Sequence, residues 1–452
     1  MATTYTSVSD AQSPHASSGR FRKLKLGAFV AVLYAYCAAG PFGFEEMVST
    51  SGPGMSLLFL ICVPWLFALP MSLATSEMAT AMPVEGGFYR WTRAAFGDFL
   101  GYQCGFWNWT GTFLMNAAYA VGLADYVAQL TPTVARGWRH WLMALFFLLL
   151  VATVNVIGIR IVGGVTKILL LTVLIPVAVF TVMGFAHAHG NPFVPLTPPG
   201  MPWREVYGVG LALGLWVYSG YEQLSTITEE VEHPERNFPL GLAIMVPLAM
   251  ITFLFPIMAG IASSDWHQWT TGYIVTVAGN IGGWWLKESM FAAAMVSILL
   301  GLQTTLLSGA RLPFTMAEDG YFHPWLAQLH DRFRTPVRGI ILSTFFCACL
   351  AVFSLPQLIA VYMWLRVATS ALTLLSVWRL RYTQPDLPRR FRIPGGTFGI
   401  AAVVLVPLTL FGWALVNGDS SALLWGPLSL ALGPASYAIW RAASKSRNAA
   451  KA

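Results

Sequence analysis

The sequence predicts an all-α integral membrane protein with twelve transmembrane helices. Its 452 residues are 56% apolar and only 10% charged, whereas about one quarter of the residues in a soluble domain are charged. The apolar residues gather in long blocks, and a membrane span needs about 20 such residues. Twelve blocks reach that length. They lie at residues 26–50, 54–82, 98–130, 139–159, 165–187, 206–228, 238–262, 287–316, 337–355, 358–379, 398–417 and 422–440.

The blocks follow one another so closely that we expect a single domain over residues 20–441. Residues 1–19 are rich in Ser, Thr and Ala, and we expect them to form a disordered cytoplasmic N-terminus. Residues 442–452 form a cytoplasmic tail. The first apolar block is too long for a cleavable signal peptide.

The charge distribution predicts the orientation in the membrane. Most of the 27 Lys and Arg residues lie at one side of the predicted spans, and Arg136, Arg139, Arg204 and Lys287 lie at the other. Since basic residues favour the cytoplasmic side, we place both termini in the cytoplasm. The net charge of +7 therefore reflects membrane topology and does not indicate nucleic-acid binding. We expect a multi-pass protein of the plasma membrane.

The first block is interrupted in its middle by Gly40-Pro41-Phe42-Gly43, and the acids Glu45 and Glu46 follow at once. Proline lacks an N–H group and disfavours helix at the residue before it, and glycine adds backbone freedom. Free backbone at membrane depth is tolerated where it lines a cavity or is buried in protein. A proline kink repaired by neighbouring helices is the alternative reading.

The sixth block has a similar interruption at Gly220, within Trp216 to Thr226, and Glu222 follows two residues later. A carboxyl group inside a span needs a partner, a proton or a cationic ligand. The alternative is that Glu222 has a structural role and is hydrogen-bonded to other groups inside the helix bundle. Two interrupted helices at corresponding places predict a 5+5 inverted repeat with a binding site between its halves. Repeat one covers about 26–187, repeat two about 206–381, and two appended helices cover 398–440.

Other polar groups fall inside predicted spans. Asn108 and Asn116 are eight residues apart, which places them near one face of a helix; bonding to neighbouring helices is the alternative. Lys167 lies two turns inside the fifth span and is either functional or extended to the inner surface. Arg366 either pairs with a carboxylate or lies nearer the membrane interface than the predicted span limits indicate. The five Cys residues show neither disulfide nor zinc spacing, so we expect no metal and no cofactor.

Three motifs together make the chain similar to a known family. They are PVEGGFY at 83–89, the W-x-x-x-G-x-E core with the turn that follows it at 216–239, and A-E-D-G-x-x-H-P at 317–324. The chain resembles the amino acid–polyamine–organocation transporter superfamily over nearly its whole length. Within it, the polyamine uptake and L-type amino acid permease branch is the most similar. The resemblance implies secondary transport and, for many members, proton coupling.

Two positions depart from the polyamine uptake permeases. Those permeases carry acids where this chain has Met115 and Thr373, and Arg366 lies near the second position. Because a polycation needs carboxylates, the sequence favours an amino acid as the substrate, with a polyamine as the alternative. An amino acid exchanger is a further alternative. A lysine in the fifth span replaces a sodium ion in some proton-coupled relatives, but Lys167 lies a turn or more too early for that role.

The predicted function is therefore a secondary active transporter and not an enzyme, and its partners are a small substrate, protons and lipid. A channel is the rival class, while a membrane enzyme is disfavoured because neither H-E-x-x-H nor G-x-S-x-G occurs. Free N–H groups after the first break should bind a carboxylate, and carbonyl groups at the second break should bind an ammonium. Glu222 and Lys167 are the candidates for proton coupling. The candidate substrate-binding residues are Ala39, Gly40, Phe42, Gly43, Glu45, Asn116, Trp216, Tyr218, Ser219, Gly220, Tyr221 and Glu222.

Overall fold

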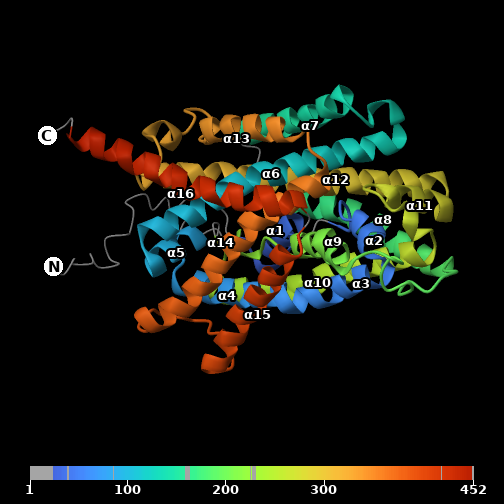
Figure 1. The fold of residues 1–452 in the computed structure, drawn as a ribbon, viewed down its shortest axis with the longest axis horizontal. Coiled ribbons are helices and arrows are strands. Elements are labelled where there is room, and N and C mark those ends of the chain that lie inside the picture. The colour runs from blue at the N-terminus through green and yellow to red at the C-terminus, as the bar shows by residue number, and fades with distance from the viewer. Residues whose placement is uncertain are drawn as a thin grey trace.

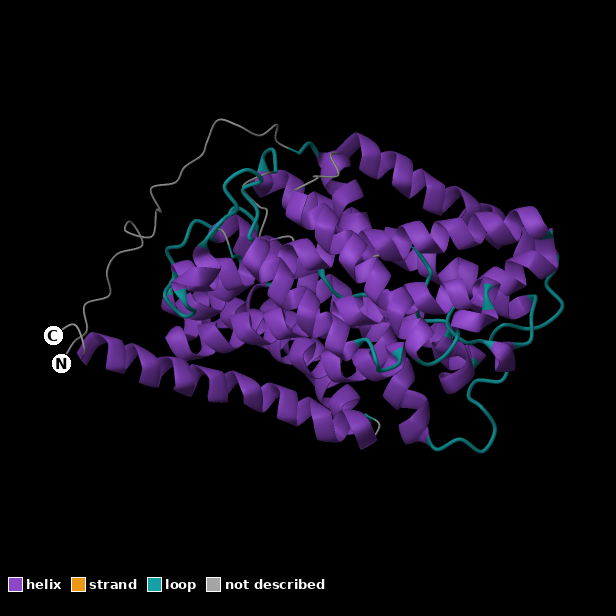
Figure 2. Cartoon of the chain, turned by 90° about the horizontal axis from the view of Figure 1, so that it is seen from above, coloured by secondary structure: helices purple, strands orange, loops and turns teal. Residues whose placement is uncertain are grey.

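The computed structural model describes residues 24–37, 40–84, 86–157, 163–223, 225, 231–418 and 420–449. Helices make up nearly all of the regular structure in these ranges, and short loops join them (Figure 2). Many of the long helices run roughly along the longest axis of the molecule (Figure 1). Apolar side chains cover much of their outward surface, as expected for helices in contact with lipid.

The first half of the chain contains helices α1 to α8. The first predicted span contains two short helices, α1 and α2, separated by a non-helical segment. A π-helical segment at Pro64–Ala68 divides the second span into α3 and α4. The helices are α1 (Leu26–Cys37), α2 (Glu46–Ser51), α3 (Pro53–Val63), α4 (Leu69–Ala81), α5 (Phe88–Phe96), α6 (Asp98–Leu130), α7 (Trp138–Ile157) and α8 (Gly163–Ala186).

Helices α9 to α16 follow from residue 203 onward. The sixth predicted span ends early, because α9 stops at Val217. The helices are α9 (Trp203–Val217), α10 (Pro234–Ala262), α11 (Tyr273–Gly282), α12 (Trp284–Glu318), α13 (Val337–Leu350), α14 (Leu355–Thr383), α15 (Gly396–Val416) and α16 (Ser420–Ala449).

Eight helical segments in the described ranges are long and apolar enough to cross a membrane. Three shorter apolar helices, α1, α11 and α13, accompany them. The all-helical membrane architecture is thus confirmed, while the count of twelve spans and the inverted repeat remain predictions. Helices α5 and α11 were not expected from the apolar blocks.

The two predicted interruptions are present. Residues 40–45 are not helical, and Gly40 and Gly43 have φ angles of 130° and 90°. In the second interruption Gly220 has a φ angle of 112°. Only glycine adopts such angles readily, so the glycines that the sequence indicated lie inside the interruptions, in backbone conformations outside the helical region.

The three motifs that carry the family resemblance lie together. The Tyr89 hydroxyl donates a hydrogen bond to Oδ2 of Asp319 at 2.8 Å, which joins the first motif to the third. A Cβ atom added to Gly87 would lie 2.0 Å from Oγ of Ser225, so the first motif packs directly on the second. These segments meet near α5, at one end of the bundle in Figure 1, while α2, α3 and α11 lie toward the other end.

Candidate functional site

A cavity of about 70 Å³ lies where the two interrupted helices meet. A single water molecule needs about 10–15 Å³ of such space, so a ligand of several non-hydrogen atoms fits. Helices α1, α6, α9, α10, α12 and α14 and both interruptions contribute side chains. The lining residues are Ala35, Tyr36, Cys37, Gly40, Phe42, Phe44, Asn108, Thr112, Met115, Tyr119, Trp216, Val217, Ser219, Gly220, Gln223, Phe253, Ser297, Ile298, Gly301, Thr305, Tyr362 and Arg366.

The interruptions contact each other through small residues. A Cβ atom added to Gly220 would lie 3.5 Å from Sγ of Cys37, at the end of α1. A Cβ atom added to Gly43 would lie 3.2 Å from the Trp216 ring. The Trp216 ring is also held by α6, because its Nε1–H points to the sulfur of Met115 at 3.0 Å. Trp216 therefore forms a fixed wall of the cavity between the two breaks.

Glu45 accepts a hydrogen bond from one of the peptide groups that the first interruption leaves open. Its buried carboxylate accepts hydrogen bonds from the N–H of Gly43 at 2.9 Å, from the N–H of Gly272 at 3.3 Å and from the Tyr126 hydroxyl. The N–H of Phe42 donates to the carbonyl of Gly40 at 3.0 Å. The expectation that Phe42 and Gly43 offer free N–H groups is therefore wrong in this conformation, since a local carboxylate and a local carbonyl have taken them.

A buried ion pair lies beside the second interruption. Nη2 of Arg366, on α14, lies 2.5 Å from Oε1 of Glu222, and the two side chains are 3% and 0% exposed. The Ser370 hydroxyl donates to the same oxygen at 3.3 Å. Of the two alternatives for Arg366, the structure shows pairing with a carboxylate. Arg366 is one of the lining residues of the cavity, and Glu222 is not.

Comparison with known proteins decides the family. The family model for amino acid permeases matches residues 26–430. The chain belongs to the amino acid permease family. A probable polyamine transporter of Arabidopsis thaliana is 30% identical over 415 residues, which cover 91% of this chain and 86% of the relative. The branched-chain amino acid permease BcaP of Bacillus subtilis is 25% identical, with 87% and 89% covered. A vacuolar cationic amino acid transporter of Arabidopsis thaliana is 24% identical, with 88% and 70% covered.

The permease places five of the predicted binding residues on the cavity wall: Gly40, Phe42, Trp216, Ser219 and Gly220. Gly43 and Glu222 do not line the cavity but contact Trp216 and Arg366, which do. Glu45 lies one contact further away, hydrogen-bonded to Gly43. Ala39 lies outside the described residues. Lys167 belongs to α8, but its side chain is outside the described part of the chain.

Three other predicted residues are buried away from the cavity. The Tyr218 hydroxyl donates to the carbonyl of Leu60 at 2.8 Å, so this side chain fastens the second break to α3. The side chains of Tyr221 and Asn116 are buried, at 1% and 0% exposure, and neither residue lines the cavity. Asn108, the other asparagine of α6, does line it.

Several lining residues of the permease, among them Thr112 and Tyr119, were not selected from the sequence, although a helical pattern marks them. Asn108, Thr112, Met115 and Tyr119 recur at spacings of four, three and four residues along α6. Such spacing places side chains on one face of a helix. The same argument applies to Ser297, Gly301 and Thr305 along α12.

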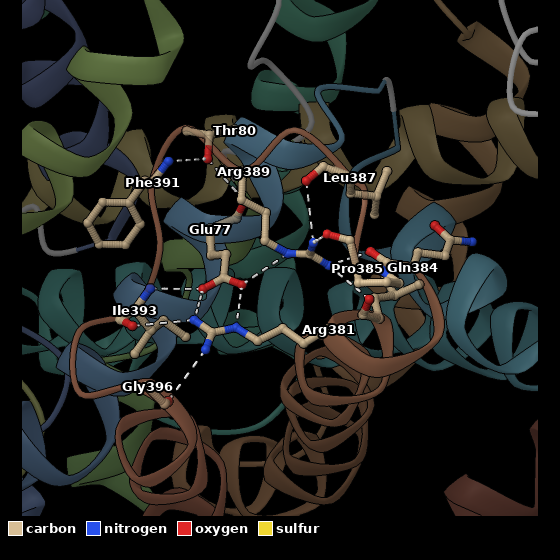
Figure 3. A network of polar contacts seen from close by, with 11 residues as sticks. Glu77, Thr80, Arg381, Gln384, Pro385, Leu387, Arg389, Phe391, Ile393 and Gly396 are labelled. Atoms are coloured by element: carbon tan, nitrogen blue, oxygen red, sulfur yellow. Dashed lines mark hydrogen bonds and ion pairs between the residues drawn. The ribbon is translucent and has the colours of Figure 1, made fainter.

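A second buried charge network lies away from the cavity and was also missed. Glu77, near the end of α4, is fully buried and accepts hydrogen bonds from Nε and Nη2 of Arg381 at 2.8 and 2.5 Å. It also accepts one from the N–H of Ile393 at 2.9 Å, and Nε of Arg389 lies 3.4 Å away. Figure 3 shows the carboxylate between the two guanidinium groups. The network ties α4 to α14 and to the segment before α15.

Proposed function

We propose that this permease is a secondary active transporter that moves an amino acid across the plasma membrane by alternating access. The observation that carries the proposal is the cavity between the two interrupted helices. Interrupted helices at the middle of a bundle are the usual place for a small charged substrate in transporters. Both termini lie in the cytoplasm in this proposal.

The substrate in this proposal is an amino acid because the cavity wall offers both donors for a carboxylate and acceptors for an ammonium group. The Arg366 guanidinium supplies N–H donors for a carboxylate. The carbonyl groups at residues 218–220 supply acceptors for an ammonium, since a carbonyl oxygen has two lone pairs and can accept a second bond. Trp216 and Phe42 supply apolar contact for a side chain. A zwitterion matches this pattern better than a molecule that carries only amines.

Proton coupling is assigned to Glu222, with Lys167 as the second candidate. Glu222 is buried and is joined to the cavity through Arg366. A proton on this carboxylate would remove its charge and release the guanidinium toward the substrate. Substrate binding and protonation would then be linked, which is what symport requires.

A polyamine is the alternative substrate, because several similar plant proteins are named polyamine transporters. Exchange of amino acids is an alternative mode of transport.

A thermal-shift screen of the purified permease separates these substrates. A ligand that binds only the native state stabilises it by about 2.7 kcal/mol at 100 times its dissociation constant. We expect one or more amino acids to raise the unfolding temperature, while putrescine and spermidine leave it unchanged. Stabilisation by the polyamines alone would overturn the amino acid assignment. Counterflow exchange in proteoliposomes then distinguishes a carrier from a channel.

A further inference from the structure

The cavity of the permease is bordered by one formal charge within the described part of the chain, and this charge is positive. Arg366 is the charged residue among the described lining residues, and none of those residues is an Asp or a Glu. Glu45 and Glu222, the acids beside the interruptions, are both already paired with protein groups. Glu45 accepts three hydrogen bonds from protein groups, and Glu222 is paired with Arg366.

The ion pair is asymmetric with respect to the cavity. Arg366 is among the residues that line the cavity, whereas Glu222 is not. Nε and Nη2 of Arg366 are buried and make no hydrogen bond within the described residues, so Nη2 meets Glu222 as an ion pair, and Oε2 of Glu222 also has no hydrogen-bond partner there. A buried charged group normally fills its hydrogen-bonding capacity. The guanidinium therefore retains N–H donors for a ligand carboxylate, whereas the charge of Glu222 is already neutralised by Arg366, so its second oxygen offers a ligand amine an acceptor but no net negative charge.

We propose that Arg366 is the residue that sets the substrate class, because its guanidinium occupies the carboxylate that a substrate amine would otherwise use. The side chain acts as an internal cation tethered to α14. A diamine or polyamine entering the cavity meets a like charge at low dielectric and finds no free carboxylate, which is strongly unfavourable. A substrate with a carboxylate and a net charge of zero or below is accepted. This inference rests on the proposed function and adds the residue that enforces it.

The test removes the internal cation while keeping its volume. Arg366→Met deletes the charge and frees Glu222, so putrescine binding should appear, with an affinity about tenfold or more above that of the unmodified permease. The double variant Arg366→Met with Glu222→Gln should lose that binding again, because the freed carboxylate is gone. Arg366→Lys keeps the charge and should still exclude putrescine. Arg139→Met, which deletes an exposed arginine in α7, is the matched control.

Binding of putrescine, glutamate and leucine to each purified variant is measured by thermal shift and by calorimetry. A gain of putrescine binding in Arg366→Met that depends on Glu222 supports the proposal. A uniform loss for all three ligands without any gain would show that the pair is only structural, and would overturn it.

A second arm remains informative if Arg366→Met does not fold. Glu222→Gln alone leaves the guanidinium without its partner, so glutamate should bind more tightly and putrescine should still be excluded. Putrescine binding to Glu222→Gln would overturn the assignment. Failure of the proposed function has a different signature, since the unmodified permease would then bind putrescine and no amino acid.

Discussion

Replacing Gly220 with alanine should destabilise the permease although the added methyl group has room. The backbone of Gly220 has a φ angle of 112°, where a residue with a Cβ atom costs about 1–3 kcal/mol. The added Cβ would lie 3.5 Å from Sγ of Cys37 and from Cε1 of Tyr36, which is ordinary van der Waals contact. The free-energy cost therefore arises from the backbone of the interruption and not from a clash.

Such a cost changes the equilibrium between the native and the disrupted site by about 5- to 150-fold. The matched control is Gly412→Ala in α15, where a Cβ atom would meet nothing within 4 Å. Alanine is favoured over glycine inside a helix, so this control should be neutral or stabilising. The assays are thermal unfolding in detergent and substrate uptake by proteoliposomes. Equal unfolding temperatures and equal uptake for both variants would refute the reasoning.

Three substitutions of buried acids give further predictions. Glu45→Gln should reduce transport of cationic and neutral substrates equally, because the carboxylate holds protein groups; a loss confined to cationic substrates in uptake assays would contradict this. Glu77→Gln should lower the unfolding free energy by about 3–5 kcal/mol, since it breaks a buried pair. Denaturant titration measures it, and the exposed Glu288→Gln is the control. Glu222→Gln should keep substrate binding but lose accumulation driven by an imposed pH gradient, and an unaltered gradient response rejects the coupling role.

The helices and the interruptions could be predicted from the sequence because their causes are local. Apolar length marks a span, and glycine beside proline or polar residues marks a break. Helix α5 was missed because its apolar residues alternate with Arg90 and Arg93 on an amphipathic surface, so no apolar block appears. Helix α11 was missed because its ten residues are too few for a span.

The cavity could be predicted only in part, because its side chains are brought together by distant packing. The sequence indicated Asn108 and Asn116 equally, and only the rotation of α6 against its neighbours decides that Asn108 faces the cavity. Glu45 looked free for a substrate because its partner Tyr126 lies 81 residues away. The partner of Arg366 could not be chosen among several acids without the positions of α14 and the second break.

The most direct test of the central claim measures whether substrate protects Cys37 from a small thiol reagent. Cys37 lines the cavity, and Cys62 is exposed on α3, so variants that retain one or the other cysteine form a matched pair. At 100 times its dissociation constant, a transported amino acid should slow the modification of Cys37 by about 100-fold and leave Cys62 unchanged. Modification of Cys37 at the same rate with and without a transported substrate would contradict the placement of the site between the two interrupted helices.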